Sequence, residues 1–103
     1  MYAILFEIEP SVAAQNCGVP YNQVSDKITE LLQGYDFIRE QEGVYLSKTA
    51  SKQQAIAAIE ALSNRDWFLL SVVKIQLFKI EEWEDFSPKM DKKMQELLFR
   101  ISK

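Results

Sequence analysis

Alternating hydrophobic positions mark the first predicted strand, at residues 2–9. One face would carry Tyr2, Ile4, Phe6 and Ile8, and the other Ala3, Leu5, Glu7 and Glu9. Both faces begin with apolar residues, which is typical of a central strand in a sheet. Pro10 ends the pattern, because proline has no amide hydrogen to donate to a neighbouring strand.

A loop is predicted over residues 11–20, because Asn16, Gly18 and Pro20 interrupt any regular pattern there. Helical spacing follows, and Gly34 stands where a helix would end. The apolar positions of this helix are Tyr21, Val24, Ile28, Leu31 and Leu32. The pattern predicts an amphipathic helix with one face toward a core.

A β-hairpin is predicted next, with strands over residues 35–40 and 44–47 and Gly43 in the turn. Ser51 and Gln54 form a capping box that opens a second helix. The apolar stripe of that helix and its expected stop are Ala55, Ala58, Ile59, Leu62 and Asn64.

A last strand is predicted from Leu69 or Leu70 to Ile80, followed by an acidic loop. Its two faces would be Val73, Ile75 and Leu77 on one side and Val72, Phe78 and Ile80 on the other. A terminal helix should start with Ser87 as its cap and Pro88 in its first turn. Its apolar stripe consists of Met90, Met94, Leu97, Leu98 and Ile101. Such a stripe needs a groove, on its own domain or on a partner chain.

The order of elements predicts an α+β protein with a ferredoxin-like βαββαβ sandwich and an added C-terminal helix. The first and third strands would lie in the middle of the sheet. Helices would cover one sheet face, and the other would meet water, a ligand or a second subunit. Residues 1–82 would form the ferredoxin-like domain, and the acidic loop and amphipathic helix at 83–103 would belong to the same domain.

Composition narrows the chemistry of this chain. Its 103 residues fit one small domain, and a net charge of −3 argues against broad electrostatic binding of nucleic acid, leaving room for a local basic patch. The absence of histidine excludes Ser-His and Cys-His nucleophiles and His-containing zinc sites. A single cysteine, Cys17, cannot form an internal disulfide. Without a signal peptide pattern or a long apolar run, a soluble cytoplasmic protein is expected.

Four segments within residues 1–82 form a recognisable combination: MYAILFEIE at the start, PYNQVSDKITELL in the first helix, the YDFI…EGVYLS hairpin and the late VVKIQLFKIEE strand. Together they resemble the virulence-associated protein D family. The resemblance implies a ferredoxin-like homodimer related to the small endonucleases of CRISPR adaptation. It also implies an endoribonuclease, often the toxin of a toxin–antitoxin pair.

The end of the first strand departs from the usual pattern of that family. The family typically has Phe-Asp-hydrophobic-Asp, whereas this chain has Phe6-Glu7-Ile8-Glu9. Each acid is therefore one methylene longer. A displacement of a catalytic carboxylate by about 1 Å can cost on the order of 100-fold in rate. The change from aspartate to glutamate therefore bears on catalysis and leaves the fold untouched.

Glu7 and Glu9 are the leading catalytic candidates. At a two-fold axis each carboxylate would meet its own copy, and such like charges need a divalent cation, a shared proton or basic neighbours. Glu7 would then bind Mg²⁺ or Mn²⁺, which could activate water for phosphodiester hydrolysis. In the structural alternative, Glu9 is a solvated strand end and a partly buried Glu7 pairs with a lysine or arginine.

The other candidates would contact RNA. Tyr21 and Asn22 could hold phosphate at a helix start, or serve as packing residue and cap. Tyr45 and Ser47 share a strand face, where they could complete the catalytic site by holding a base or phosphate, or simply pack across strands. Further RNA-binding candidates, which could equally form surface salt bridges, are Arg39 and Lys48.

Two functions remain open at this point. The first is a metal-assisted endoribonuclease that acts as a homodimer, the toxin of a toxin–antitoxin pair with RNA as substrate and an antitoxin as protein partner. The alternative is a catalytically silent ferredoxin-like dimer that serves as a protein- or nucleic-acid-binding regulatory module.

Overall fold

The computed structural model describes residues 1–102 of the chain. Its strands are β1 (Tyr2–Ile8), β2 (Ile38–Gln41), β3 (Val44–Ser47) and β4 (Val72–Lys79). Its helices are α1 (Pro10–Cys17), α2 (Tyr21–Gln33), α3 (Lys52–Ser63), α4 (Asp66–Ser71) and α5 (Ser87–Ile101).

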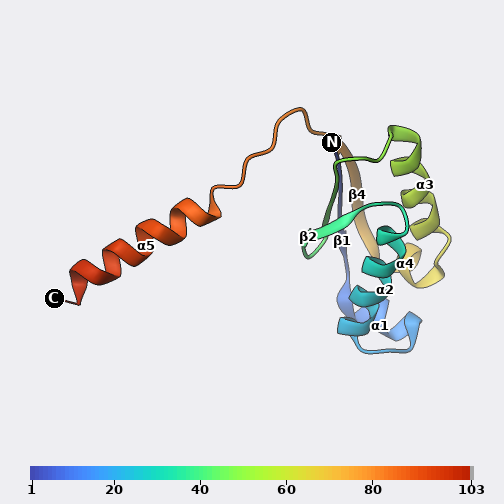
Figure 1. Cartoon of the computed structure of the whole chain (residues 1–103). Helices are drawn as coiled ribbons and strands as arrows, with labels where there is room; N and C mark the ends of the chain where they lie inside the picture. The colour runs from blue at the N-terminus through green and yellow to red at the C-terminus, as the bar shows by residue number, and fades with distance from the viewer. Residues whose placement is uncertain (103) are drawn as a thin grey trace.

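The four strands form one antiparallel sheet in the order β2-β3-β1-β4. Helices α1 to α4 pack on a single face of this sheet, and the other face has no helix of the same domain over it (Figure 1). This arrangement confirms the predicted α+β, ferredoxin-like sandwich. It also confirms that the first and third strands lie in the middle.

The core lies between the sheet and the helices. Phe6 stacks on Tyr45 at 5.8 Å between ring centroids and meets Phe68 of α4 edge-on at 5.4 Å. The largest side chains that are at most about 2% exposed come from both layers and include Ile4, Val24, Ile28, Leu32, Phe37 and Leu62. Burying one such side chain contributes roughly 1.5–3 kcal/mol, so this cluster is the main source of stability.

The predicted loop over residues 11–20 is wrong, because α1 occupies most of it. Pro10 stands in the first turn of α1, where its missing amide hydrogen costs nothing and its fixed φ suits a helix. Gly18 ends the helix in the left-handed conformation, with φ 77°. The proline and the glycine therefore bound a short helix at the end of β1.

The last strand begins later than predicted, at Val72, because residues 66–71 form helix α4. A register shift between Glu7 and Ile8 places Val72 opposite Ile8 and Lys74 opposite Glu7. The shift turns Val73 outward, with 59% of it exposed, while Val72 packs on the core. The predicted face shared by Val73, Ile75 and Leu77 is therefore wrong at its first member.

The predicted strand over residues 35–40 also starts later, at Ile38. Asp36 has a φ of 68°, so the chain turns there before β2 begins. Ser51 caps α3 by accepting the amide hydrogen of Gln54 at 3.1 Å, which confirms the predicted cap. The Gln54 side chain reaches across instead and donates to the Tyr35 carbonyl and the Asp36 carboxylate, both at 3.0 Å.

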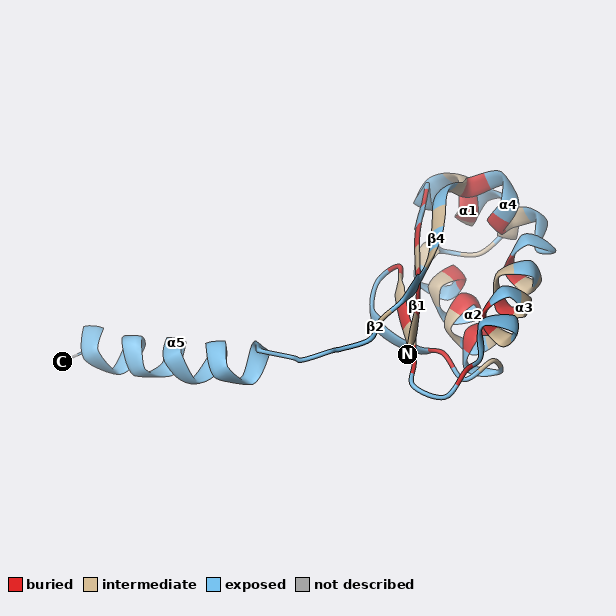
Figure 2. Cartoon of the chain, turned by 90° about the horizontal axis from the view of Figure 1, so that it is seen from above, coloured by how far each residue is buried: buried red, intermediate tan, exposed pale blue. Residues whose placement is uncertain are grey.

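Helix α5 stands well away from the sheet, at the end of an extended linker on the open side (Figures 1 and 2). The radius of gyration of 17.2 Å exceeds the roughly 13 Å expected for a compact 100-residue domain. Phe86 occupies the cap position of α5, so the prediction of Ser87 as the cap is wrong. Asp85, just before it, accepts the Ser87 amide hydrogen at 2.9 Å. Over the described residues, no helix is long and apolar enough to cross a bilayer.

Candidate functional site

Glu7 lies near the end of β1, on the sheet face that the helices leave open. It is exposed rather than partly buried as expected, because the strand alternates and Glu7 faces away from the helical layer that covers Phe6 and Ile8. Lys74 is its cross-strand neighbour on β4, yet no ion pair joins these two described side chains. The Glu7 carboxylate is therefore available to solvent and ligands.

Three segments distant in sequence meet beside Glu7. A pocket of about 230 Å³ is lined by the end of β1, by Tyr21 at the start of α2, and by Glu42 and Gly43 in the β2–β3 turn. The remaining lining residues are Phe6, Ile8 and Pro10. This pocket, called here the β1-end pocket, is therefore lined by two acidic residues, Glu7 and Glu42, and by Tyr21.

Gly43 holds the hairpin turn against β1. The Phe6 amide donates to the Gly43 carbonyl at 2.9 Å, and Gly43 has a φ of 76°. A Cβ at this position would lie 2.4 Å from the Phe6 carbonyl oxygen, so only glycine allows this approach. The turn therefore fixes Glu42 at the rim of the pocket.

Tyr21 and Glu42 are joined directly, since the Tyr21 hydroxyl donates to the Glu42 carboxylate. Partial burial raises the pKa of Tyr21 to about 12, and the hydrogen bond and negative charge of Glu42 act in the same direction. The positive charge of Arg39 lowers the same pKa, which places Arg39 electrostatically close to this pair. Tyr21 is therefore a hydrogen donor throughout the physiological range.

Glu42 is the site residue that the sequence did not single out. The one feature of the sequence that could have pointed to Glu42 is its position directly before Gly43 in the hairpin turn. The predicted strands gave no indication that this turn lies beside the end of β1 and the start of α2.

Glu9, the second predicted acid, lies outside the β1-end pocket. It is exposed and precedes α1, where its amide donates to the Ser71 carbonyl at 2.8 Å and its carbonyl accepts from Ala13 at 3.0 Å. Its backbone thus joins α1 to α4. A catalytic role for the Glu9 carboxylate stays a prediction, and it would lie outside the β1-end pocket.

Tyr45 and Ser47 do lie beside β1, opposite Ile4 and Tyr2, as the topology predicted. Tyr45 is only 1% exposed, and its hydroxyl is hydrogen-bonded to Thr29 at 2.7 Å. Ser47 is 2% exposed and accepts the amide hydrogens of the following turn. The expected RNA contacts of both residues do not fit this placement, because their polar atoms are buried and already bonded.

The remaining RNA-binding candidates are exposed but scattered. Asn22 lies in the first turn of α2 and caps nothing, because Pro20 occupies the cap position. Arg39 lies on β2 opposite Tyr45, close to the Tyr21–Glu42 pair. Lys48 follows β3 near the start of β1, about 17 Å from Glu7 at the usual rise per residue. The structure thus unites Glu7, Tyr21 and Arg39 and separates Lys48 from them.

Among the described residues, no group of three or more His, Cys, Asp or Glu side chains could hold a metal. The β1-end pocket offers two carboxylates, Glu7 and Glu42. That donor set suits Mg²⁺ or Mn²⁺, since Mg²⁺ commonly takes one or two protein carboxylates and completes its shell with water and substrate phosphate. The residues therefore fit such an ion bound together with a phosphodiester.

Comparison with known proteins gives several relatives of similar length. The chain is 39% identical to "Endoribonuclease VapD" of Dichelobacter nodosus over 87 residues, which cover 84% of this chain and 94% of the relative. It is 35% identical to "Endoribonuclease VapD" of Helicobacter pylori, covering 84% and 95% of the two chains. The chain belongs to the VapD family. A further VapD relative, "Endoribonuclease VapD 1" of Riemerella anatipestifer, is 36% identical over 74% of this chain and 85% of its own length.

No protein-family model matches the chain, so its membership in the VapD family rests on these relatives. The matches span nearly the whole length of two of the VapD relatives while leaving about a sixth of this chain unmatched. The family relation confirms the resemblance inferred from the sequence.

Proposed function

We propose that this VapD-family chain is an endoribonuclease and that the β1-end pocket is its cleavage centre. The observation that carries the proposal is the convergence of Glu7, Tyr21 and Glu42 from three separate elements. Two carboxylates and a protonated phenol are groups that can take up and supply protons during cleavage of a phosphodiester. The names of the relatives support RNA as the substrate.

Each side chain has a role that follows from its surroundings. Glu42 accepts a proton or orients the attacking hydroxyl, because its carboxylate already accepts hydrogen from Tyr21. Tyr21 stays protonated at neutral pH, and its single hydroxyl hydrogen is donated to Glu42, which orients the Glu42 carboxylate. Arg39, which lies within electrostatic reach of Tyr21, adds positive charge for the phosphate.

Mg²⁺ or Mn²⁺ would be held by Glu7 and Glu42, and such an ion supplies Lewis acidity and neutralises charge on the phosphate. Both acidic residues line the same pocket, and the extra methylene of Glu7 relative to the usual aspartate gives its carboxylate a longer reach. The role of Glu7 is then to position the ion and the scissile phosphate.

The test is cleavage of single-stranded and structured RNA, with Mg²⁺, Mn²⁺ or EDTA, by the wild type and three variants. Glu7→Gln removes the charge with little change in shape and should lower the rate about 100-fold or more. Glu7→Asp restores a carboxylate and should recover part of the activity. Glu60→Gln, on the exposed side of α3, is the control and should match the wild type. Equal cleavage by all four proteins, or none by any, would rule out the proposal.

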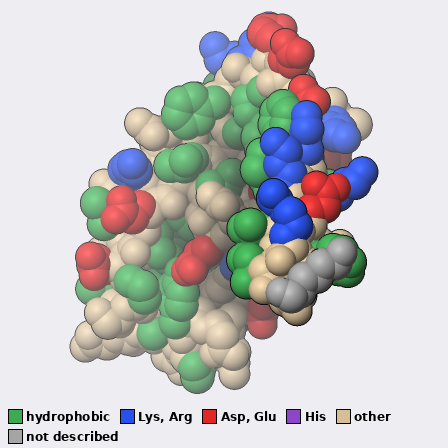
Figure 3. Space-filling model, turned by 90° about the vertical axis from the view of Figure 1, so that its left-hand side faces the viewer, with side chains coloured by type: hydrophobic (Ala, Val, Ile, Leu, Met, Phe, Trp, Pro, Cys, Tyr) green, Lys and Arg blue, Asp and Glu red, His purple; other side chains and the backbone are tan. Residues whose placement is uncertain are grey.

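We also propose that the chain acts as a homodimer through its open sheet face. That face is apolar, and a hollow of about 460 Å³ on it is lined largely by hydrophobic residues, namely Ala3, Leu5, Val44, Leu46, Phe78, Ile80 and Trp83, together with Lys79. Figure 3 looks onto this face, where hydrophobic side chains are spread widely behind α5. An exposed apolar area of this kind favours a protein interface.

Helix α5 supplies the complementary surface for such a dimer. No residue of α5 is buried, although its apolar stripe includes Met90, Met94, Leu97, Leu98 and Ile101, each about half exposed or more. At 1.5 Å per residue the helix is about 22 Å long, close to the roughly 24 Å length of β1. The α5 of one copy can therefore cover the open sheet face of the other.

Light scattering during size-exclusion chromatography tests the dimer. The wild type should elute as a dimer, and Leu98→Glu should shift it toward monomer because it places a charge in the apolar stripe. Gln95→Glu, which lies off the stripe, adds the same charge and should leave the dimer intact. A wild-type monomer would contradict the dimer and favour the alternative, a regulatory module whose α5 binds an antitoxin or another protein partner.

A further inference from the structure

A second cleft lies on the opposite side of the molecule from the open sheet face, in the helical layer. It has a volume of about 390 Å³ and lies between α2 and the connection from α3 to α4. Its lining side chains are Lys27, Glu30, Leu31, Arg65 and Trp67. The volume falls within the range of about 300–1,000 Å³ that small-ligand sites occupy.

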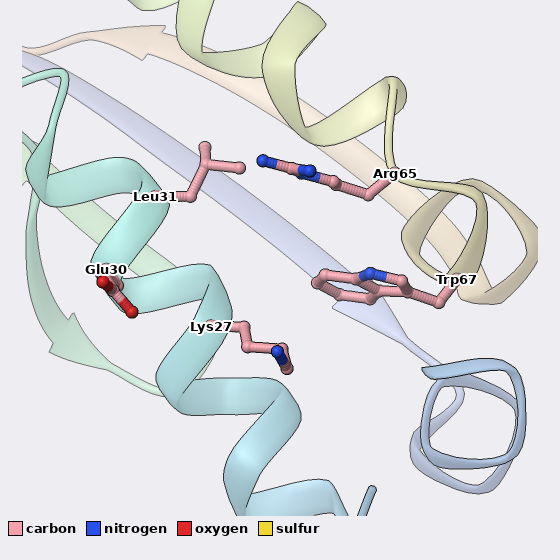
Figure 4. A pocket seen from close by; sticks show the side chains of 5 residues that line it. All are labelled: Lys27, Glu30, Leu31, Arg65 and Trp67. Carbon is pink, nitrogen blue, oxygen red and sulfur yellow. The ribbon is translucent and has the colours of Figure 1, made fainter. Parts of the chain in front are cut away.

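Side chains extend into the cleft from both of its walls (Figure 4). Arg65 projects toward α2 from the α3–α4 connection, and Trp67 does so from the first turn of α4. Lys27 extends from α2 toward the Trp67 ring. Glu30 stands on the α2 wall, on the far side from Trp67 in this view. The cleft therefore combines an aromatic face with two cations.

Neither cation is neutralised within the described part of the chain. The ion pair recorded there joins Lys79 to Glu81, at the far end of β4. Lys27 and Arg65 thus leave the cleft lining with two positive charges and one negative, in a chain whose net charge is −3. A local positive excess on an acidic protein favours an anionic ligand at this place.

We propose that this cleft binds a nucleotide unit, with its phosphate between Lys27 and Arg65 and its base against Trp67. Guanidinium and ammonium groups recognise phosphate, and every nucleobase can stack on an indole ring. The site is separate from the β1-end pocket and does not depend on cleavage there. It would hold either one residue of an RNA strand or a free mononucleotide.

Fluorescence of Trp67 reports binding directly. In a Trp83→Phe background Trp67 is the sole tryptophan, because the chain contains two. The ligands are a single-stranded 2′-O-methyl RNA octamer in EDTA, adenosine monophosphate, and inorganic phosphate. Stacking should quench the fluorescence with the octamer or the mononucleotide and not with phosphate alone. Quenching by the octamer at far lower concentration than the mononucleotide identifies a strand as the ligand.

Charge variants distinguish binding in this cleft from non-specific electrostatic attraction to the protein surface. Arg65→Gln should weaken binding about tenfold and, for the octamer, reduce the slope of log K against log salt by about 0.7, as loss of one phosphate contact does. Lys52→Gln removes an equally exposed charge at the far end of α3 and should leave the affinity and the slope unchanged. The Trp67 variants lack this reporter, so their binding is measured by the fluorescence anisotropy of a dye-labelled octamer. Trp67→Phe should retain most of the affinity, whereas Trp67→Ala should lose about tenfold.

The proposal is overturned if Arg65→Gln and Lys52→Gln bind alike, or if no ligand changes the Trp67 signal. Glu7→Gln serves as a further control, because it removes the proposed cleavage function while leaving this cleft intact. Failure of cleavage with intact Trp67 quenching would count only against the cleavage centre. Normal cleavage without quenching would count only against the nucleotide cleft.

Discussion

Replacing Gly43 by alanine is the sharpest structural test of how the β1-end pocket is assembled. Gly43 has a φ of 76°, and an added Cβ would meet the Phe6 carbonyl oxygen at 2.4 Å, 1.0 Å short of ordinary contact. The turn must therefore move away from β1. That movement weakens the 2.9 Å hydrogen bond from the Phe6 amide to the Gly43 carbonyl.

Gly18 provides a matched control for the backbone conformation. Its φ is 77°, almost the same value, but a Cβ there would meet nothing within 4 Å. Gly18→Ala should therefore cost only the left-handed penalty of about 1–2 kcal/mol. Gly43→Ala carries that penalty, a share of the lost hydrogen bond of about 0.5–1.5 kcal/mol, and the steric displacement, for a total of about 3 kcal/mol or more.

Urea unfolding followed by circular dichroism measures the difference. With a dependence of about 1–3 kcal/mol per molar urea, Gly43→Ala should unfold roughly 1 M earlier than Gly18→Ala. It should also cleave RNA more slowly, because Glu42 moves with the turn. Equal midpoints for the two variants would refute the claim that close approach at Gly43 holds the turn against β1.

Three further predictions follow from particular contacts. Ser47→Ala should lower the free energy of unfolding by about 1–3 kcal/mol, because the Ala50 and Thr49 amides lose their acceptor. RNA cleavage under native conditions should stay unchanged. Loss of cleavage by a fully folded variant would restore Ser47 as a catalytic candidate. Because folding raises the pKa of Tyr21 from 10.0 to about 12, its contribution to stability is complete below pH 10 and is lost as the pH rises to about 12. Urea midpoints at pH 9, 10 and 11 should therefore fall more steeply for the wild type than for Tyr21→Phe, and parallel curves would contradict this. Met94→Glu should dissociate the dimer into monomers because it places a charge in the apolar stripe of α5, and chromatography with light scattering measures the mass. An unchanged dimer mass would exclude this stripe from the interface.

The sequence alone predicted most of the fold because the signals involved are local. Alternation in β1, helical spacing in α2 and the Ser51 cap each depend on neighbouring residues, and the sheet order follows from the order of elements. The errors arose where tertiary context decides. Leu69 and Leu70 form strand-like apolar sequence, yet α4 continues until Ser71 because Phe68 is anchored in the core.

The candidate site likewise combines residues that local sequence indicates with residues that only the tertiary structure reveals. Glu7 could be proposed from its position at the end of a strand, whereas Glu42 became a candidate only when the hairpin turn was seen against β1 and Tyr21. Tyr45 was expected to contact RNA because alternation cannot tell which face of β3 the helices cover. The aromatic stack on Phe6 shows that Tyr45 belongs to the covered face.

A pair of variants in the β2–β3 hairpin tests whether the β1-end pocket cleaves RNA. Glu42→Gln removes an acidic side chain that lines this pocket, and Glu40→Gln removes one two residues earlier that lines a different hollow near Lys48. Glu42→Gln should cleave single-stranded RNA about 100-fold more slowly than Glu40→Gln, which should equal the wild type. Equal rates for the two variants would show that RNA cleavage does not take place at this pocket.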